Sequence, residues 1–394
     1  MEPVHGDKRL DVLALEPWLG GSHLQFLEQF AAHSRHGVET IGLAPRHWKW
    51  RMKAGAWELA RRLKREARPR PDVLLVSDFV DLPALFGELP ADWAALPALL
   101  YFHENQLTYP VRSFPGDDER RKSEGAASSL ARADHHFGMT NILSCLRAER
   151  VVFNSHFHLQ DFRAAARELL GILPRPRPRV ELEDALAAAR VIAPGIDLTE
   201  VPLGAGPAEG RPLRVLFPHR PEHDKRPHVF LAAAAEALAR GAQLEFVCLG
   251  EGTGQAFATL PAENCVQRGR LACRTEYARL VGSCDVVVST ARHEFFGLAV
   301  AEALAAGCTP LLPRRQNYPD LIGSATNDGF HHCGLYETDG QLTSALVAAA
   351  GEFEPYRVPQ HRAAMRALVE EHRVQTVAAA LDGLIADMAA SPKR

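Results

Sequence analysis

The sequence predicts an α/β fold built from two doubly wound parallel sheets. Short apolar runs alternate with helical patterns along the chain, which is typical of βαβ units. The Gly/Pro-rich stretch VPLGAGPAEGRP at 201–212 interrupts this alternation, after which it restarts. A chain of 394 residues with 46% hydrophobic residues is long enough to bury two cores. We therefore expect a Rossmann-like domain over 1–203, a second over 204–375, and a C-terminal helix at 376–394 that can return to the first domain.

Each element is predicted from a local pattern. In the first domain, strand candidates lie at 11–15, 38–43, 72–77, 98–102, 150–153 and 190–193. In the second, strand candidates lie at 213–217, 243–249 and 285–289, with helices at 228–240, 275–282 and 298–306 and a last helix at about 360–390. Gly37 and Gly241 are expected to end the helices before them, and the Pro/Arg run at 174–180 is expected to be a surface loop. Because ligands bind at the carboxyl ends of parallel strands, we expect a ligand cleft between the two domains.

The composition narrows the class of protein. No apolar run approaches the ~18–20 residues needed to span a bilayer, and the first apolar run is too short for a signal peptide. The formal net charge of −3 argues against a protein that coats nucleic acid in bulk. The seven cysteines are odd in number and form no CxxC pair, which favours reduced thiols in a cytoplasmic protein. The histidine pairs at 135–136 and 331–332 fit no zinc spacing, and we expect them to be structural.

One segment, residues 35–70, is strongly basic. It contains eleven Lys or Arg residues against three acids, with Trp48, Trp50 and Trp57 interleaved. Two interpretations are open. The segment is either a solvated helix face whose tryptophans pack inward, or a phosphate-contacting surface whose aromatic rings can stack on bases.

The stretch HEFFGLAVAEALAAG at 293–307 places two glutamates in an apolar, helix-forming run. An unpaired carboxylate is costly on the packed side of a helix, so both acids face either water or a ligand. The helix is expected to begin near Gly297 at the carboxyl end of a strand, where its N–H groups form an anion site. Glu294 and Glu302 would then flank a nucleotide sugar. The alternative is that Glu294 caps the helix and Glu302 is solvated.

Two cations are expected at the same cleft. Arg220 and Lys225 lie in HRPEHDKRP, which follows the strand at 213–217. A nucleotide diphosphate gains negative charge as its bond to the sugar breaks, so fixed cations there stabilise the transition state more than the ground state. The alternative is that both are surface charges of a loop.

Two loops of the first domain add candidate binding groups. The loop EPWLGGSH at 16–23 carries Gly20 and Gly21, which permit close backbone approach at a helix start, although neither a GxGxxG nor a Walker pattern is present. The loop after the strand at 98–102 contains His103, Glu104, Asn105, Gln106 and Tyr109. Binding groups collect in such strand-end loops, so we expect a site here.

Together these residues resemble the retaining glycosyltransferases of the GT-B fold. The spacing of Glu294 and Glu302 matches the donor motif of that superfamily, and Arg220 with Lys225 matches its diphosphate-binding pair. Longer motifs, from about residue 10 to 325, are similar to the tRNA-queuosine mannosyltransferase family: GGSH (20–23), the WKW-type basic segment (46–53), YFHENQLTYPV (101–111), NILSCL (141–146), VVFNS (151–155), PHRPEHDK (218–225) and STARHEFFG (289–297).

The resemblance implies transfer of mannose from GDP-mannose, with retention, to the cyclopentenediol of queuosine in a tRNA anticodon. It implies no metal or other cofactor, because protein cations neutralise the diphosphate. The departing phosphate would help to deprotonate the acceptor from the same face of the sugar.

The resemblance also implies roles for single residues. Glu294 would hold donor hydroxyls and Glu302 the ribose. Arg220 and Lys225 would bind the diphosphate, and His103 would lie near the reacting sugar. Glu294, His103, Arg220 and Lys225 are thus the expected catalytic residues. The backbone groups expected to assist donor binding belong to Gly20, Gly21, Phe296, Gly297 and Leu298. Acceptor contacts are expected from His23, Lys49, Trp50, Arg51, Glu104, Asn105, Gln106 and Tyr109.

Two other functions remain open from the sequence. One is a GT-B glycosyltransferase that acts on a lipid-linked or soluble glycan. The other is a non-catalytic tRNA-binding protein with a nucleotide-sugar pocket. The sequence contains no basic amphipathic membrane helix, so no membrane partner is expected, and no obligate protein partner is evident.

Overall fold

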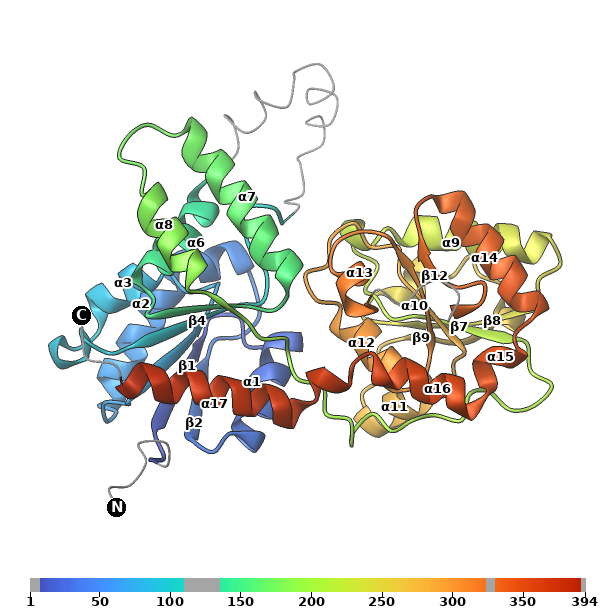
Figure 1. Cartoon of the computed structure of the whole chain (residues 1–394), viewed down its shortest axis with the longest axis horizontal. Coiled ribbons are helices and arrows are strands. Elements are labelled where there is room, and N and C mark those ends of the chain that lie inside the picture. The colour runs from blue at the N-terminus through green and yellow to red at the C-terminus, as the bar shows by residue number, and fades with distance from the viewer. Residues whose placement is uncertain (1–7, 110–134, 324–329, 391–394) are drawn as a thin grey trace. The chain divides into compact units, whose positions relative to one another are not determined.

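The chain folds into two compact units, each with its own parallel sheet (Figure 1). Unit 1 consists of Met1–Gly195 and Val374–Arg394, and unit 2 consists of Ile196–Arg373. This computed structural model describes residues 8–109, 135–323 and 330–390. Residues 110–111 of the motif at 101–111 and residues 391–394 of the predicted C-terminal helix therefore lie outside the described residues.

The boundary between the units lies before the Gly/Pro-rich stretch. Ile196 pairs with Arg373 in an isolated parallel bridge, and Arg366 donates hydrogen bonds to the carbonyl groups of Leu198 and Val201. These contacts tie residues 196–203 to unit 2, whereas the sequence placed them in the first domain. The Gly/Pro-rich stretch that begins at residue 201 therefore places the domain boundary a few residues too late in the chain.

Unit 1 contains a six-stranded sheet in the described part of the chain, with the order β2-β1-β3-β4-β5-β6 and every adjacent pair parallel. Its strands are β1 (Asp11–Glu16), β2 (Gly37–Gly42), β3 (Val73–Ser77), β4 (Ala98–Phe102), β5 (Arg150–Phe153) and β6 (Arg190–Val191). All six predicted strands of this domain are present. The sequence located them because a sheet covered on both faces needs apolar strands.

Helices cover both faces of this sheet (Figure 1). They are α1 (Gly21–His33), α2 (Trp48–Glu66), α3 (Leu82–Glu88), α6 (His136–Arg147), α7 (His156–Ile172), α8 (Arg179–Ala187) and α17 (Val374–Ala390). Leu13 and Leu15 of β1 pack with α2, α3, α6, α7 and α8, whereas Val12 and Ala14 pack with α1 and α17. Strand β1 thus alternates its side chains between two cores.

Two predicted boundaries in unit 1 are wrong. Helix α1 ends at His33, and Ser34 is already extended. Gly37 does not end the helix in a left-handed conformation; it opens β2 and donates its N–H to the carbonyl of Leu10. The predicted loop at 174–180 is shorter than expected, because Arg179 begins α8.

The C-terminal helix α17 belongs to unit 1. The single helix predicted at 360–390 is two helices, α16 (Pro359–Ala367) and α17, with a 3-10 turn at Glu370–His372 between them. Asp382 of α17 accepts hydrogen bonds from the Ser34 hydroxyl (2.5 Å) and from the backbone N–H of Arg35 (2.8 Å). These bonds hold α17 beside the end of α1.

Unit 2 also contains a six-stranded parallel sheet within the described residues, with the order β12-β11-β10-β7-β8-β9. Its strands are β7 (Leu213–Phe217), β8 (Leu244–Leu249), β9 (Cys265–Gly269), β10 (Val286–Val288), β11 (Thr309–Pro313) and β12 (Gly334–Tyr336). Its helices are α9 (Pro227–Ala239), α10 (Thr253–Ala256), α11 (Arg274–Gly282), α12 (Leu298–Ala305), α13 (Tyr318–Leu321), α14 (Asp339–Gly351), α15 (Glu354–Arg357) and α16. Gly241 adopts a positive φ of 84° just after α9, which confirms the predicted stop.

Three strands of unit 2 were missed by the sequence analysis. Strand β9, CVQRG, is only partly buried and carries polar residues, because it lies at an edge of the sheet. Strand β11, TPLLP, contains two prolines, and β12 has only three residues. None of these segments has the apolar run of ordinary length that identified the others.

A buried arginine fixes two helices that carry site residues. Arg362 is 1% exposed, and its guanidinium donates hydrogen bonds to the carbonyl groups of Gly204, Gly282, Cys284 and Ala306. Gly282 and Ala306 lie at the carboxyl ends of α11 and α12. A cation is favourable there, because the helix dipole is negative at that end.

Replacing Arg362 by Met is expected to destabilise the protein by about 3 kcal/mol or more, since each buried carbonyl that loses its donor costs about 1–3 kcal/mol. Chemical unfolding followed by circular dichroism measures this loss. Gln360→Ala, at an exposed position of the same helix, is the control. Equal stability of the two variants would contradict the role of Arg362.

Candidate functional site

Lys225 and Glu294 meet at the carboxyl edge of the unit 2 sheet. Lys225 ends the 3-10 turn His223–Lys225 after β7, and Glu294 lies in the loop after β10. The Lys225 ammonium lies 3.1 Å from the Glu294 carboxylate and 3.1 Å from that of Asp224, and it donates to the carbonyl of His293 (2.7 Å). Burial would lower the pKa of Lys225, but the charges of Glu294 and Asp224 raise it overall. Lys225 is therefore a fixed cation.

The helix start beside Glu294 agrees with the prediction. Gly297 has a φ of 94° and is the N-cap residue of α12. The Glu294 carboxylate pairs with Lys225, and in the described chain it accepts no hydrogen bond from the first turn of α12, so the alternative that Glu294 caps this helix is wrong. Asn317 donates to the carbonyl of Phe296 (2.9 Å), which fixes the loop before the helix. The N–H groups that follow Gly297 are in the position expected for an anion site.

Glu302 is neither solvated nor isolated. Glu302 is 4% exposed, and its carboxylate accepts hydrogen bonds from Arg274 (2.5 Å) and from the Tyr277 hydroxyl (2.9 Å). Both partners lie on α11, one turn apart. No local pattern in the sequence indicates Arg274 and Tyr277 as site residues, although a buried acid needs such partners.

Arg220 is not seated with Lys225. Its side chain is 62% exposed, and its guanidinium pairs with Glu222 at 3.2 Å. The sequence correctly placed both cations in one loop, but loop spacing does not determine where a long side chain points.

Behind Lys225, a buried polar network supports the end of β10. Nε2 of His219 lies 2.8 Å from the Ser289 hydroxyl, which lies 2.7 Å from the Tyr318 hydroxyl. Tyr336 donates to the carbonyl of Ser289 (2.7 Å). Burial, and then the charge of Lys225, lower the pKa of His219 to about 3, so this histidine is neutral. No local pattern in the sequence indicates this network.

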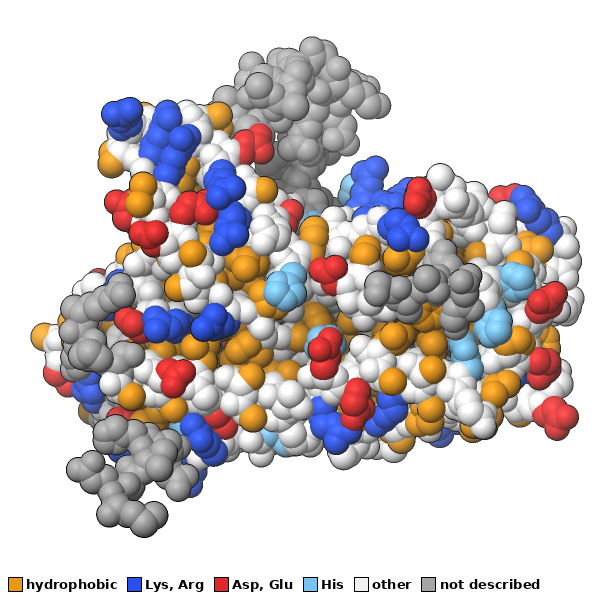
Figure 2. Space-filling model, in the orientation of Figure 1, with side chains coloured by type: hydrophobic (Ala, Val, Ile, Leu, Met, Phe, Trp, Pro, Cys, Tyr) orange, Lys and Arg blue, Asp and Glu red, His pale blue; other side chains and the backbone are white. Residues whose placement is uncertain are grey.

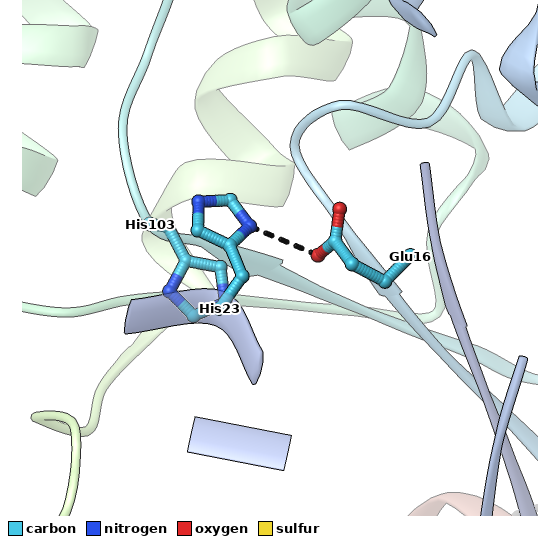
Figure 3. A group of neighbouring side chains, drawn as sticks. All are labelled: Glu16, His23 and His103. Atoms are coloured by element: carbon cyan, nitrogen blue, oxygen red, sulfur yellow. Dashed lines mark hydrogen bonds and ion pairs between the residues drawn. The ribbon is translucent and has the colours of Figure 1, made fainter. Parts of the chain in front are cut away.

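In unit 1, the structure brings His23 and His103 together with an acid that the sequence analysis did not name (Figure 3). Glu16 ends β1, His23 lies in the first turn of α1, and His103 follows β4. Nδ1 of His23 donates to Oε2 of Glu16 (3.0 Å), and Oε1 of Glu16 accepts the backbone N–H of Trp18 (2.8 Å). The imidazole rings of His23 and His103 stack with centroids 4.0 Å apart.

The two histidines have opposite protonation. Burial alone would lower the pKa of His23, but the charge and hydrogen bond of Glu16, with the charges of Asp78 and Glu104, raise it to about 9. Burial, and then the charge of His23, lower the pKa of His103 well below its usual value. At neutral pH, His23 is therefore an imidazolium and His103 a neutral imidazole.

Asp78 completes this cluster. Its residue is fully buried, and Oδ1 accepts the backbone N–H of His103 (2.8 Å). Within the described residues, Oδ2 of Asp78 has no hydrogen-bond partner. Burial, and then the charge of Glu104, raise the pKa of Asp78 well above its usual value.

The spacing of this cluster suits a metal, but its ring geometry does not. Ligand atoms of Glu16, His23 and His103 lie within 4.8 Å of one another. Imidazole lone pairs lie in the ring plane, and bound metals sit about 2.0–2.1 Å from nitrogen in that plane. The two rings are stacked and only 28° from parallel, so their lone pairs do not converge on one point.

The remaining predicted loop residues have mixed roles. Asn105 is fully buried, and its side-chain oxygen accepts the backbone N–H groups of Leu107 and Thr108 (both 3.1 Å), so it shapes the loop. Gln106 donates from its side chain to Glu104 (2.8 Å). Tyr109 lies edge-on to Trp48 of α2, with ring centroids 6.4 Å apart.

Glycine is required at positions 20 and 21 for two different structural reasons. A Cβ on Gly20 would lie 2.5 Å from Cγ of Pro45, so close packing excludes a side chain. Gly21 has a φ of 56° and open space around it at the start of α1. The backbone of Gly21 is thus accessible, as donor binding would require.

The basic segment forms one exposed face of α2, which we call the α2 surface and define as Trp50, Lys53, Trp57, Arg61 and Arg65. Trp50 and Trp57 are 62% and 49% exposed, so the interpretation that the tryptophans pack inward is wrong for these two. The Arg61 guanidinium lies 4.7 Å from the Trp57 ring centroid. In the described chain, Lys53, Arg61 and Arg65 form no ion pair, whereas the neighbouring Arg51 pairs with Glu58 at 2.9 Å. Lys49 lies beside this face, 5.6 Å from the Trp48 ring centroid.

Basic side chains also gather over the end of α7 and the start of α8 on the face shown in Figure 2. The Pro/Arg run contributes Arg175, Arg177 and Arg179 there. Glu183 partly neutralises this area, because it pairs with Arg167 (2.5 Å) and Arg163 (3.6 Å). This area has no exposed aromatic ring comparable to those of the α2 surface.

Known proteins match both units. Residues 11–196 match the family described as tRNA-queuosine alpha-mannosyltransferase N-terminal, and residues 205–332 match glycosyl transferases group 1. A relative from Drosophila melanogaster, a tRNA-queuosine alpha-mannosyltransferase, is 29% identical over an alignment of 354 residues, and the match covers 85% of each chain.

Solved structures show the same fold. The catalytic domain of starch synthase IV from Arabidopsis thaliana matches with a TM-score of 0.69 and 13% identity, over 98% of this chain and 100% of that one. Sucrose-phosphate synthase from Thermosynechococcus elongatus matches with a TM-score of 0.67 and 14% identity, over 97% and 100% of the two chains. The fold and the two matched families define a glycosyltransferase of the GT-B class.

Within that class, the chain belongs to the tRNA-queuosine alpha-mannosyltransferase family. The predicted fold class, family and enzyme class are thereby confirmed. All seven cysteines are free thiols. Among the described helices, none is both long and apolar enough to cross a bilayer.

The pKa of His23 is expected to fall in a Glu16→Gln variant, because the amide keeps a hydrogen-bond acceptor but removes the charge. An NMR titration of the imidazole resonances should give a midpoint near pH 9 in the unmodified protein and a clearly lower one in the variant. Glu28→Gln, at an exposed position of α1, should leave the midpoint unchanged. The same midpoint in all three proteins would show that Glu16 does not hold the proton on His23.

Proposed function

We propose that this enzyme transfers mannose from GDP-mannose to the cyclopentenediol of queuosine in tRNA, with retention and without a metal, in the cytoplasm. The observation that supports this proposal is that the two units match two different families. The queuosine family matches unit 1, while the group 1 glycosyltransferase family matches unit 2, which holds the Lys225–Glu294 pair. The free thiols are in keeping with a reducing compartment.

Unit 2 supplies the chemistry for the donor. Lys225 is a fixed cation that stabilises the diphosphate as charge develops on it, together with the N–H groups after Gly297. Arg220, exposed in the same loop, supplies a second cation once the diphosphate attracts it. Such protein cations take the role that a metal ion plays elsewhere.

Glu294 and Glu302 bind different hydroxyl groups of the donor. Glu294 is held by Lys225, and it accepts hydrogen bonds from the sugar. Arg274 and Tyr277 take one acceptor position each on Glu302. With its carboxylate oriented by these two side chains, Glu302 accepts a hydrogen bond from a ribose hydroxyl.

The transfer proceeds on one face of the sugar. The bond between the anomeric carbon and the diphosphate oxygen breaks, and the acceptor oxygen bonds to the same carbon from the same side. The proton of the acceptor hydroxyl passes to the departing phosphate oxygen. No enzyme carboxylate needs to form a covalent intermediate in this scheme.

The first test is a transfer assay with queuosine-containing tRNA and GDP-mannose, UDP-glucose or UDP-galactose in parallel. Mass spectrometry of the nucleosides should show a hexose added to queuosine with GDP-mannose alone. Glu294→Gln should lower the rate by about 100-fold or more, because it removes donor contacts made in the transition state. Glu337→Gln, at an exposed acid of unit 2, should not. Donor hydrolysis without a tRNA product would move the acceptor to a glycan, and donor binding without turnover would favour a non-catalytic protein.

We also propose that the α2 surface binds the tRNA. Its unpaired cations supply phosphate contacts, and Trp50 and Trp57 can stack on unpaired bases. Arg62 and Lys64 are weaker candidates, since they pair with Glu66 (2.8 Å) and Glu88 (3.7 Å).

Charge reversal at Arg61 and Arg65 is therefore expected to weaken tRNA binding by about tenfold or more and to reduce its salt dependence, while GDP-mannose affinity stays the same. Filter binding at several salt concentrations measures this effect. Reversal of Arg240 and Arg270, two exposed arginines of unit 2, is the charge-matched control. Unchanged tRNA affinity in the Arg61 and Arg65 variant would dismiss the α2 surface.

A further inference from the structure

Glu16 and His23 form a buried acid–imidazole dyad with one open end. Glu16 is 1% exposed and uses one oxygen on Trp18 and the other on Nδ1 of His23. His23 is 7% exposed, and its second ring nitrogen, Nε2, points away from Glu16 (Figure 3). Within the described residues, Nε2 makes no hydrogen bond, and it is not one of the fully enclosed unpartnered atoms, so it is open to a ligand. The N–H of a largely buried charged ring needs an acceptor, which either water or a ligand supplies.

The charges around His23 determine which chemical class of ligand this cluster favours. The groups that act on His23 come from three strand ends: Glu16 at the end of β1, Asp78 after β3, and Glu104 after β4, beside the neutral His103. Three carboxyl groups around one imidazolium leave no net positive charge. A phosphate is therefore disfavoured, whereas a neutral hydroxyl group, which both accepts and donates hydrogen bonds, suits the cluster.

A second, independent observation also indicates a ligand. Asp78 is fully buried, yet Oδ2 has no hydrogen-bond partner in the described part of the chain. A carboxyl oxygen in this state lacks the partner that buried polar groups ordinarily have. A ligand with two adjacent hydroxyls could supply both an acceptor for His23 and a donor for the carboxyl groups beside it.

We propose that the Glu16–His23 dyad binds a hydroxyl of the acceptor diol through Nε2 of His23, with Glu16 as its positioning residue. This inference rests on the proposed function, in which unit 1 receives the queuosine. Glu16 fixes one proton on Nδ1 of His23, and the other proton, on Nε2, is donated to the hydroxyl oxygen. His103 stacks on the ring of His23, with centroids 4.0 Å apart, and limits its rotation.

The dyad gives acceptor binding a particular pH dependence. Because Glu16 keeps the proton on Nδ1, the proton lost on deprotonation is the one on Nε2, and the donor becomes an acceptor. Acceptor affinity should therefore be full at neutral pH and fall as the pH rises through about 9. Removing the charge of Glu16 should shift that loss to lower pH, which a merely structural role would not do.

The experiment measures kinetics of the full-length enzyme from pH 6 to 10 with queuosine-containing tRNA and GDP-mannose, for His23→Gln, Glu16→Gln and the control His33→Gln, which lies later in α1. His23→Gln is expected to raise the KM for tRNA by about tenfold or more, with the KM for GDP-mannose unchanged. Glu16→Gln is expected to move the alkaline limb of kcat/KM for tRNA to lower pH. His33→Gln should match the unmodified enzyme in both respects.

A direct binding measurement distinguishes the role of the dyad from the proposed transferase function. Calorimetry with the queuosine nucleoside alone reports on the dyad even if no sugar is transferred. Loss of this binding in His23→Gln, with GDP-mannose binding retained, supports the dyad. Equal nucleoside affinity in His23→Gln and His33→Gln overturns it and leaves the transferase function intact. Activation by Mn²⁺ or Zn²⁺ that disappears in His103→Gln would also overturn it, in favour of a metal site.

Discussion

Parallel strand pairing is the constraint on which both sites depend. In each unit every strand runs in the same direction, so all carboxyl ends reach one edge of the sheet. Residues separated by dozens of positions therefore meet there: Glu16 meets His103 in unit 1, and Lys225 meets Glu294 in unit 2. Because helices bury both faces of such a sheet, its ends are where the backbone can present polar side chains to a ligand.

Each site keeps a buried cation by surrounding it with acids. Lys225 lies between Glu294 and Asp224, and His23 is held by Glu16. A cation removed from water is stable only when such partners compensate the loss of hydration. The same partners fix its direction, so little rearrangement is needed when a ligand arrives. Both units thus hold a buried cation beside acidic side chains, each at the site proposed for a different ligand.

The sequence predicted the parts of the structure that depend on local pattern. The strands of unit 1 were found because each is a short apolar run, whereas β9 and β12 were missed because one is polar and the other very short. Lys225 and Glu294 were predicted because their residue types follow strands. Glu16, Arg274 and Tyr277 were not, because Glu16 ends an apolar strand and the others lie on an ordinary amphipathic helix. Their roles arise from pairing between side chains, and spacing along one chain does not encode such pairing.

The return of α17 to unit 1 has a consequence for biosynthesis. Val377, Leu381, Ile385 and Met388 of this helix complete the core that contains Phe26 and Phe30 of α1. These residues leave the ribosome only after the whole of unit 2, which is one continuous segment. Unit 2 can therefore fold before α17 is available, whereas one face of the unit 1 sheet stays incompletely covered until α17 has emerged from the ribosome. A ribosome that stops between the units would release a chain with an exposed aromatic surface, a natural substrate for chaperones and proteases.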